Sequence, residues 1–380
     1  MKNAPSTEMD KETLARYSRQ ILMPEFGRSS QSALTRSRVL VVGAGGLGSP
    51  VISYLAAAGI GTIGIVDDDF VDVTNLHRQI IHEERAVGTA KVLSAQRWVH
   101  EHNSNINVLV HQTRLNEVNG LAIADDYDVI VDGSDNFATR YLVGDISAIQ
   151  GKPLVWGSVF KFSGQTTVFW PGHGPTYRDV FPEMPPPGAV PSCAEAGVIG
   201  AVCATIGSTM ALEVVKLIAG IGEPLVGRLL TFDGLTQRWR ELDISGAAGS
   251  TPIPSALSRE QPPACLIPDV ADVSLTASYV AEMLRDREAG GRPFRLIDVR
   301  TEEEHVIAAI DGAELVPMAV LEGEASAWNP TDSIVVFCKS GVRSNEAHRL
   351  LEQRGFTDVR TLKGGIDAWS ATVDPTLARY

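Results

Sequence analysis

One cysteine of the chain stands in a sequence context that favours nucleophilic chemistry. Cys338 follows an apolar run at 334–337, which is typical of a buried strand, and it opens the sequence Cys-Lys-Ser-Gly-Val-Arg-Ser, which leads into a helix that ends at Arg354. Successive backbone N–H groups at a helix N-terminus, with Arg343 beside them, favour a thiolate. We therefore predict that Cys338 is a nucleophile, and the same loop would also suit a persulfide anion. An ordinary semi-buried cysteine is the alternative.

A second group of residues has the spacing of a phosphate-binding turn. Its glycines are Gly43, Gly45, Gly46 and Gly48. They follow an apolar run at 39–42 and precede a helical stretch at 49–58, a second apolar run at 63–66 and the acids Asp67 and Asp69. Such a βαβ unit presents the N–H groups of a helix N-terminus to a phosphate and an acid to a ribose hydroxyl. The sequence therefore predicts nucleotide binding.

Charged residues further along the chain bear on which nucleotide binds. NAD or FAD is the usual ligand of such a turn, but Arg78 supplies a cation that a dinucleotide enzyme does not need. Asp135 follows the apolar run 129–131, and open α/β sheets bind ligands at the carboxyl ends of their strands. We therefore expect Asp135 to face the phosphates. The alternative is that Asp135 or Asn136 only caps the next helix.

Composition limits the class of protein. A chain of 380 residues with 44% hydrophobic residues exceeds the usual single-domain size and can form two cores. Its net charge of −13 argues against nonspecific binding to nucleic acid or anionic membranes. The 4 cysteines form no CxxC pair, which suits a reducing cytosol, and the first residues contain no apolar segment for secretion or anchoring. We expect a cytoplasmic protein with no nucleic-acid and no membrane partner.

The elements that must position these residues alternate between strands and helices. This order predicts an α/β fold with a larger unit at 1–245 and a smaller one at 273–380. Between them, 246–272 is rich in Gly, Ala, Ser and Pro without helical or strand periodicity, which indicates a flexible linker. No internal repeat is visible.

Two further segments are predicted to be helical. Residues 13–21 carry two arginines three positions apart, the second being Arg19, so both lie on one face of the predicted helix. Their spacing alone indicates a solvent-exposed surface. Residues 197–218 are long and apolar enough to be mistaken for a membrane span, but they include Glu213 and Lys216. We predict a buried helix there, with a face toward a subunit partner as a further possibility.

At this point the motifs resemble known families. Residues 16–136 resemble the ubiquitin-activating-enzyme superfamily, in particular the MoeB and ThiF enzymes, because RYxRQI, GxGGLG, DxDxVxxxNLxRQ and SDN all occur in order. Residues 274–380 resemble a rhodanese domain through DVR, CKSGVRS and GGxxAW. The combination resembles the MoeZ type of adenylyltransferase–sulfurtransferase. It implies a Rossmann-like ATP-binding domain followed by a smaller α/β rhodanese domain.

The resemblance implies ATP as the nucleotide, with Mg²⁺. It places Arg78 and Lys91 on the phosphates, Asp67 and Asp69 near the ribose and Mg²⁺, and Asp135 as the magnesium ligand. The other residues implied at the nucleotide site are Thr74, Asn75, Leu76, His77 and Asn136. A carboxylate that attacks the α-phosphate needs charge neutralisation and alignment and no general base.

The resemblance also implies partners. The substrate would be the C-terminal Gly-Gly of a small ubiquitin-like sulfur carrier, activated as an acyl-adenylate and then attacked by the Cys338 persulfide. The sulfur donor would be a cysteine desulfurase or thiosulfate. Cys193 matches a loop cysteine that forms an acyl linkage or resolves a disulfide, and an inert thiol is the alternative. Arg19 matches an arginine that reaches across from a second subunit, which implies a homodimer.

One departure from the MoeB pattern concerns zinc. That pattern has two CxxC pairs, but the positions of the first pair are here Thr176 and Asp179, and Cys203 and Cys265 stand alone. Four sulfurs therefore cannot gather at tetrahedral spacing, and we expect no structural zinc. The histidines show no ligand spacing and are assigned surface or packing roles.

Other functions remain open on the sequence alone. A nicotinamide or flavin oxidoreductase explains the glycine turn but leaves Arg78, Lys91 and Asp135 without a role. A carrier-binding scaffold with a dead active site conflicts with the presence of these residues and of Cys338. A tyrosine-phosphatase-like loop is a minor alternative for the cysteine. The pathway, whether molybdopterin, thiamine, cysteine or thiolated tRNA, stays undecided.

In the smaller unit, Asp298 and Arg300 stand at the end of the predicted strand 294–297. We expect a structural pair there and not catalytic groups.

Overall fold

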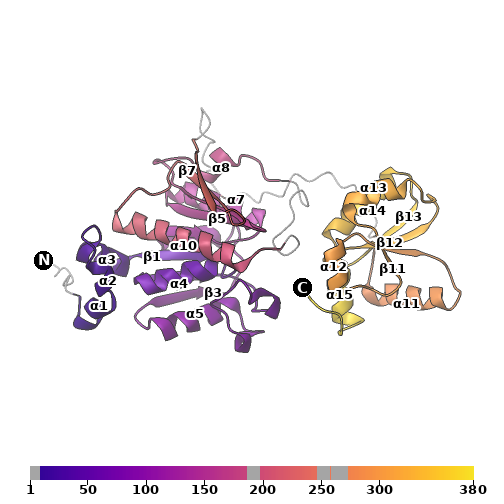
Figure 1. Ribbon diagram of the computed structural model, residues 1–380, viewed down its shortest axis with the longest axis horizontal. Helices are drawn as coiled ribbons and strands as arrows, with labels where there is room; N and C mark the ends of the chain where they lie inside the picture. Colours follow the sequence, from indigo (N-terminus) through magenta and orange to yellow (C-terminus); the bar gives the residue numbers. More distant parts are fainter. Residues whose placement is uncertain (1–8, 186–196, 246–256, 258–272) are drawn as a thin grey trace. The chain divides into compact units, whose positions relative to one another are not determined.

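A computed structural model describes residues 9–185, 197–245, 257 and 273–380. The chain divides into two compact units, whose described parts are 9–185 with 197–245 and 257, and 273–380 (Figure 1). Apart from residue 257, the predicted linker 246–272 lies outside the described residues.

In the described part of the first unit, a single sheet has the strand order β3-β2-β1-β4-β5-β6-β7-β8. Pairing is parallel from β3 to β5 and antiparallel from β5 to β8. The strands are β1 (Arg38–Val42), β2 (Thr62–Val66), β3 (Asn107–His111), β4 (Val129–Asp132), β5 (Leu154–Phe160), β6 (Ser163–Phe169), β7 (Arg228–Asp233) and β8 (Arg238–Asp243).

Helices cover both faces of this sheet because successive side chains of its buried strands point to opposite sides. On β1, Val39 and Val41 belong to the core that α4, α5 and α10 complete, whereas Leu40 and Val42 belong to the core that α6, α7 and α8 complete. The helices of the unit are α1 (Lys11–Arg16), α2 (Ser18–Ile21), α3 (Gly27–Arg36), α4 (Gly48–Ala58), α5 (Lys91–His102), α6 (Gly120–Asp125), α7 (Phe137–Gln150), α8 (Tyr177–Val180) and α10 (Gly200–Ala219), with the short 3₁₀ helices η1 (Val73–Asn75) and η2 (Glu84–Ala86).

The predicted helix 13–21 is interrupted in the structure. It divides into α1 and α2 at Tyr17, whose φ of −100° and ψ of 12° are not helical. Tyr17 is 5% exposed, and its hydroxyl accepts a hydrogen bond from Asn103 Nδ2 at 2.8 Å. The prediction that 13–21 is helical is therefore confirmed on both sides of Tyr17, where the helix is interrupted.

Helix α10 is the apolar segment for which a buried helix was predicted. Within the described residues it alone is long and apolar enough to span a membrane by length and composition, a test that core helices also pass. Its residues Ile206, Met210 and Val214 belong to the core of the first unit. Glu213 is 2% exposed and accepts a hydrogen bond from the Leu225 N–H at 2.8 Å. The packing confirms a helix that is buried on one side.

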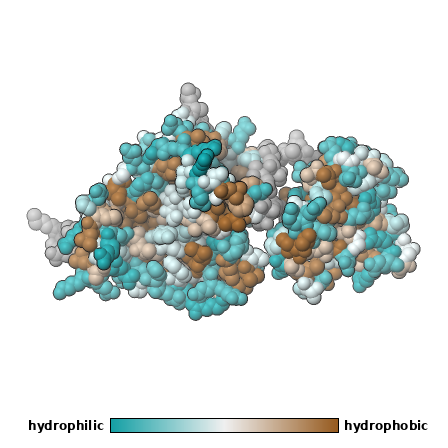
Figure 2. All heavy atoms as spheres, viewed as in Figure 1, coloured by the Kyte–Doolittle hydropathy of each residue, from teal (hydrophilic) through white to brown (hydrophobic). Residues whose placement is uncertain are grey.

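The opposite side of α10 carries exposed apolar residues. Leu212 of α10 is 56% exposed, and Tyr54 of α4, the helix packed against α10, is 58% exposed. On the face drawn in Figure 2, brown hydrophobic patches alternate with hydrophilic surface in both units. Neighbouring helices of the first unit therefore leave apolar side chains outside its core.

The second unit contains a smaller, wholly parallel sheet. Its order within the described residues is β11-β10-β12-β13-β9. The elements are β9 (Ser274–Leu275), α11 (Ala277–Glu288), β10 (Arg295–Asp298), α12 (Glu302–Ile307), β11 (Ala313–Leu315), α13 (Met318–Ala325), β12 (Ser333–Phe337), α14 (Val342–Gln353), β13 (Asp358–Leu362) and α15 (Gly365–Thr372). Val335 and Phe337 of β12 pack with α11 and α15, whereas Ile334 and Val336 pack with α13 and α14. The α/β fold predicted for both units is thus confirmed.

Candidate functional site

A cavity of about 300 Å³ lies at the carboxyl ends of β1 and β4. The chain leaves β1 through Gly43, whose φ of +91° favours glycine. A Cβ atom at Gly43 would lie 3.1 Å from the Gly133 carbonyl oxygen, so the turns after β1 and β4 touch. Because β2 and β4 lie on opposite sides of β1, this is the point where an α/β sheet opens a crevice for a ligand.

The cavity brings together many of the residues predicted from the sequence. Those that line it are Gly43, Gly45, Gly46, Asp67, Asp69, Arg78, Lys91, Asp135 and Asn136. The lining therefore combines a glycine turn, cations and carboxylates in one place.

The other predicted residues of the first unit do not line this cavity. Gly48 begins α4, and a Cβ atom there would lie 1.9 Å from the Gly43 carbonyl oxygen, so this glycine permits the turn itself. Thr74 and Asn75 hold Arg78, because its guanidinium donates to the Thr74 carbonyl at 3.2 Å and to Asn75 Oδ1 at 2.8 Å. Leu76 and His77 lie between them and Arg78 in the chain, and His77 Nε2 lies 2.7 Å from Arg78 Nη1. Arg19 is exposed on α2.

Asp67 connects the glycine turn to the acidic loop that follows β2. Its Oδ2 accepts from the Ala44 N–H and its Oδ1 from the Asp69 N–H, both at 2.8 Å. Burial raises the pKa of Asp67, against the opposing effects of Lys91 and the two N–H groups. The carboxylates of Asp67, Asp68 and Asp69 offer oxygens within 4.8 Å of one another, an arrangement that can hold a cation and is also common without one.

Lys91 opens α5 and is 5% exposed. Its Nζ lies 3.0 Å from Asp69 Oδ2. The ammonium group thus stands in the wall of the cavity, paired with a carboxylate whose side chain is 70% exposed.

Asp135 and Asn136, the two predicted site residues in the turn after β4, have different roles. Asn136 is the N-cap of α7, because its Oδ1 accepts from the Thr139 N–H at 2.9 Å. Asp135 does not cap the helix and remains exposed in the lining of the cavity. Its neighbour Asp132 is fully buried, and this burial raises the pKa of its carboxyl group.

The sequence analysis missed several residues at this site. Arg140 lines the cavity while only 7% exposed, with its guanidinium 5.3 Å from the ring centroid of Phe137 and 6.0 Å from that of Trp156. Arg140 follows Asn136 by one helical turn, which is a signal that spacing could have given. Asp68 and Arg114 also line the cavity.

His82 acts on the glycine turn from outside the cavity. It is 5% exposed, and its ring nitrogens lie 2.9 Å from the Ala44 carbonyl and 3.0 Å from Ser94 Oγ. Because a carbonyl only accepts, Nε2 carries the hydrogen and Nδ1 of the neutral ring accepts from Ser94. Burial lowers the pKa of His82, as does Lys91, while the bond to Ala44 opposes the shift.

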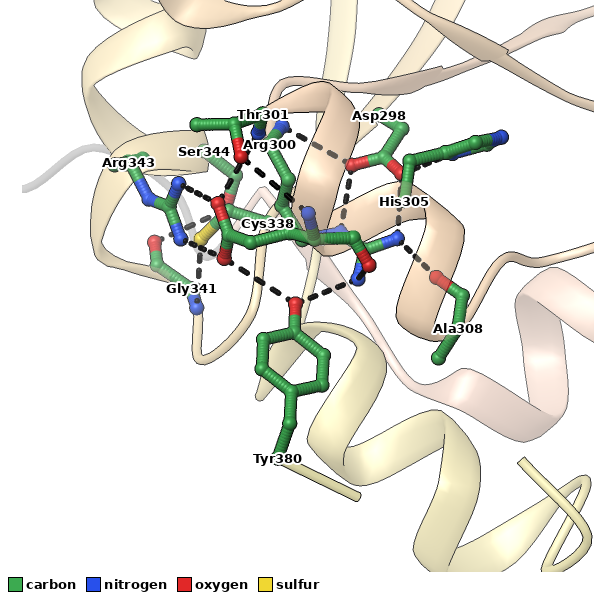
Figure 3. A network of polar contacts seen from close by, with 11 residues as sticks. Asp298, Arg300, Thr301, His305, Ala308, Cys338, Gly341, Arg343, Ser344 and Tyr380 are labelled. Atoms are coloured by element: carbon green, nitrogen blue, oxygen red, sulfur yellow. Dashed lines mark hydrogen bonds and ion pairs between the residues drawn. The ribbon is translucent and has the colours of Figure 1, made fainter. Parts of the chain in front are cut away.

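The second candidate site surrounds Cys338, which is buried at the end of β12 (Figure 3). Its Sγ accepts from the Gly341 N–H at 3.2 Å and lies 3.8 Å from Ser344 Oγ. Gly341 has a φ of +110° and is the N-cap of α14. The predicted strand, cysteine, N–H loop and helix are therefore present in this order.

Arg343, predicted to stand beside the thiol, pairs with a carboxylate from another helix. Its two terminal nitrogens donate to Glu304 Oε2 at 2.6 Å and Oε1 at 2.8 Å. Glu304 also forms a capping box with Thr301 at the start of α12. Burial alone would raise the pKa of Glu304, but the bonds from Arg343 and the Thr301 N–H lower it overall.

Beneath this pair lies the buried pair that the sequence predicted at the end of β10. Arg300 donates to Asp298 Oδ1 at 2.8 Å and Oδ2 at 2.6 Å, and both side chains are fully buried. Arg300 also donates to the Ala308 carbonyl at 2.7 Å, while His305 Nδ1 lies 2.9 Å from Asp298 Oδ2. These contacts tie α12 to the strand end and give the pair a structural role.

Three further positions named from the sequence lie in the described residues, and a fourth does not. Thr176 and Asp179, at the positions of a CxxC pair, form the capping box of α8. Cys203 lines the cavity, and a Cβ atom on Gly46 would lie 3.1 Å from its Sγ. Cys193 lies outside the described residues.

Residues 17–252 match the ThiF family and residues 276–372 match the rhodanese-like domain. The chain is 45% identical over 382 residues to the "Probable adenylyltransferase/sulfurtransferase MoeZ" of Mycobacterium tuberculosis, covering 99% of this chain and 97% of that protein. It is 37% identical over 406 residues to the "Adenylyltransferase and sulfurtransferase MOCS3-1" of Zea mays, covering 99% and 86%.

Two solved structures resemble part of the chain. E. coli MccB with ATP gives a TM-score of 0.55 at 21% identity, covering 62% of this chain and 73% of that chain. PaaA gives a TM-score of 0.55 at 22% identity, covering 65% and 78%. At these identities the likeness shows the fold alone.

Proposed function

The chain belongs to the ThiF family and carries a rhodanese-like domain, and from this premise we propose that its two units act in series on one carrier protein. It is an adenylyltransferase and a sulfurtransferase, as its relatives are named. The proposed domains are 1–245 for adenylation and 273–380 for sulfur transfer, joined by 246–272; the matched ranges 17–252 and 276–372 support this division.

In the proposed first reaction, the C-terminal carboxylate of a ubiquitin-like sulfur carrier attacks the α-phosphate of ATP. The carboxylate oxygen forms the new P–O bond, pyrophosphate leaves, and the product is an acyl-adenylate. Arg78 and Lys91 would neutralise the phosphates, and the N–H groups of the glycine turn would receive phosphate oxygens. Asp67 and Asp69 would stand near the ribose. No general base is needed because the attacking group is already an anion.

Mg²⁺ is the cation expected with ATP, and the chemistry of the donor set fits it. Asp135 is exposed in the lining of the cavity, and Asp67, Asp68 and Asp69 form a cluster that Asp67 joins to the glycine turn. Carboxylate oxygens are the ligands that Mg²⁺ prefers. We propose that Asp135 holds the ion, which when bound would neutralise phosphate charge.

In the proposed second reaction, sulfur passes through Cys338. Its thiolate attacks the outer sulfur of a persulfide or thiosulfate donor. The donor S–S bond breaks, and a thiolate or sulfite leaves with the electron pair. The terminal sulfur of the Cys338 persulfide then attacks the acyl carbon and AMP leaves. A thiol reduces the resulting acyl disulfide, which releases a carrier thiocarboxylate and leaves Cys338 in a disulfide with that thiol. Cys193 is a candidate for this thiol.

The proposed partners are a carrier that ends in Gly-Gly, a cysteine desulfurase or thiosulfate as the donor, and a second copy of the chain. Exposed Leu212 and Tyr54 on adjoining helices support a homodimer, in which Arg19 of one copy would complete the site of the other. The pathway is one of molybdopterin, cysteine, thiamine or thiolated-tRNA synthesis. The proposed location is the cytoplasm.

The observation that carries this function is the cavity in which the glycine turn, Arg78, Lys91 and Asp135 meet. The test incubates the full chain with candidate carriers, ATP and a sulfur source and weighs the carrier by mass spectrometry. We expect one sulfur to replace one oxygen. Cys338→Ala should abolish this change and leave ATP–pyrophosphate exchange intact. Absence of exchange with every Gly-Gly carrier offered would falsify the proposal.

A further inference from the structure

The hydroxyl group of Tyr380 joins two buried side chains beside the Cys338 loop (Figure 3). It lies 2.6 Å from Arg300 Nη1 and 3.2 Å from Glu304 Oε1. A guanidinium only donates, so the hydroxyl oxygen accepts from Arg300 and its hydrogen goes to Glu304. Burial raises the pKa of Tyr380 to about 12, so the hydroxyl keeps this hydrogen at neutral pH. Both hydrogen-bonding functions of the group are therefore used.

This hydroxyl reaches the cysteine loop through one carboxylate. Glu304 Oε1, which receives the Tyr380 hydrogen, also accepts from Arg343 Nη2 at 2.8 Å. Arg343 lies in the first turn of α14, two positions after Gly341, whose N–H donates to Cys338 Sγ. The bonds between Glu304 and Arg343 thus connect α12 to the first turn of α14.

The aromatic ring of Tyr380 makes a separate contact with the Cys338 loop. Lys339, the residue that follows Cys338, has its Nζ 4.6 Å from the ring centroid. A cation at this distance over an aromatic face is attracted to it. Tyr380 therefore engages both loop cations, Lys339 by its ring and Arg343 through Glu304. Among the described residues, Glu304 accepts from Arg343, and Asp367 interacts with Lys339, which opposes the rise that burial causes in the pKa of Asp367.

We propose that Tyr380 is a positioning residue for sulfur transfer, which holds the loop so that the Gly341 N–H stays directed at Cys338 Sγ. The inference rests on the proposed sulfurtransferase function. Tyr380 does not touch the thiol. It acts through Glu304 and Lys339, and its hydroxyl and its ring make separable contributions.

The two contributions can be separated by two variants of the full chain. Tyr380→Phe removes the hydroxyl and keeps the ring under Lys339, whereas Tyr380→Leu removes both. Tyr279→Phe is the matched control, because Tyr279 is 53% exposed on α11. Sulfur transfer from thiosulfate to cyanide is measured first. The Cys338 thiolate takes the outer sulfur and sulfite leaves with the electron pair. Cyanide then takes that sulfur as thiocyanate and restores the thiolate.

For Tyr380→Phe we expect kcat to fall roughly tenfold at unchanged KM for thiosulfate, the size of effect that follows loss of a hydrogen bond to a charged group. Tyr380→Leu should lower kcat at least as far and also change KM, since Lys339 is released. ATP–pyrophosphate exchange should not change in either variant. Tyr279→Phe should match the unaltered chain in every measurement.

A second measurement needs no donor and keeps a failure of the inference distinct from a failure of the proposed function. The rate of Cys338 alkylation by iodoacetamide is followed against pH by peptide mass spectrometry. We expect the pH at which the alkylation rate is half-maximal to rise in both Tyr380 variants, because the thiolate loses part of the stabilisation that the N–H group provides. Wild-type kcat in Tyr380→Phe, or an unchanged alkylation midpoint in both variants, overturns the inference. Lack of thiosulfate activity in the unaltered chain would count against the proposed function alone.

Discussion

Lys91 Nζ lies 3.0 Å from Asp69 Oδ2 in the wall of the glycine-turn cavity. The side chain of Lys91 is 7% exposed and that of Asp69 is 70% exposed, so the pair joins a buried cation to a carboxylate open to solvent. Burying an ammonium group is costly unless it is paired with an opposite charge. The ion pair with Asp69 therefore offsets the cost of placing the Lys91 ammonium group in the wall of the cavity, where the proposed function requires it.

Replacing Lys91 by methionine should remove this charge with little loss of packing. We expect Lys91→Met to slow ATP–pyrophosphate exchange by about 100-fold or more, because the variant lacks a preorganised donor to the phosphates. Lys11→Met, at an exposed position of α1, is the control and should exchange normally. Exchange by Lys91→Met at the normal rate would contradict the role of Lys91.

The carboxylate of Asp135 should set the requirement for Mg²⁺. Asp135→Asn keeps the size of the side chain and removes its charge, so the concentration of Mg²⁺ needed for half-maximal exchange should rise by at least about tenfold. Titration of exchange with MgCl₂ measures this. Asp233→Asn, at the last residue of β7 and outside the lining of the glycine-turn cavity, serves as the control. An unchanged Mg²⁺ requirement in Asp135→Asn would exclude Asp135 as the ligand.

His82 should fix the glycine turn through the Ala44 carbonyl, as Asp67 does through the Ala44 N–H. His82→Phe should raise KM for ATP by roughly tenfold and lower the free energy of unfolding by about 1–3 kcal/mol, because the buried carbonyl loses its donor. His82→Gln can still place a donor near the same position and should recover most of both losses. If the Phe and Gln variants have the same KM, the bond to Ala44 does not position the turn.

The same residue predicts a pH dependence of stability. Burial lowers the pKa of His82 from its ordinary value of 6.5, so the unfolded chain binds this proton more readily than the folded one. Its contribution is therefore complete above pH 6.5 and is lost as the pH falls through the lower pKa of the folded state. Denaturant unfolding at several pH values should show the difference between the unaltered chain and His82→Gln shrinking with decreasing pH. A difference that grows with decreasing pH would contradict the assignment.

Glycines of the turn should differ in how well they tolerate substitution by alanine. Gly48→Ala would place a Cβ atom 1.9 Å from the Gly43 carbonyl oxygen, whereas Gly45→Ala would meet only Gln79 Nε2 at 3.7 Å. We expect Gly48→Ala to destabilise the first unit by about 1–3 kcal/mol or more and Gly45→Ala to leave its stability nearly unchanged. Thermal unfolding checks both. Equal melting temperatures for the two variants would show that the close approach at Gly48 does not constrain the fold.

The sequence determined those features whose signals are local in the chain. The run from β1 through the glycines to Asp67 specifies a strand, a turn and a helix by residue type and spacing. Asp67 lies close to the turn because parallel strands end at the same edge. The strand before Cys338 and the helix after it are specified in the same way. The α/β fold follows from that local order, as does the expectation that Asp135 faces the glycine turn, whereas the resemblance to known families implied the places of Arg78 and Lys91.

Only the tertiary structure decided which groups those residues meet. Arg343 pairs with Glu304, 39 positions away, and the Tyr380 hydroxyl reaches Glu304 across 76 positions. His82 reaches Ala44 across 38 positions, and the Tyr17 hydroxyl meets Asn103 across 86 positions. No local pattern encodes such contacts, because burial and hydrogen bonding between distant segments depend on how the sheets and helices pack.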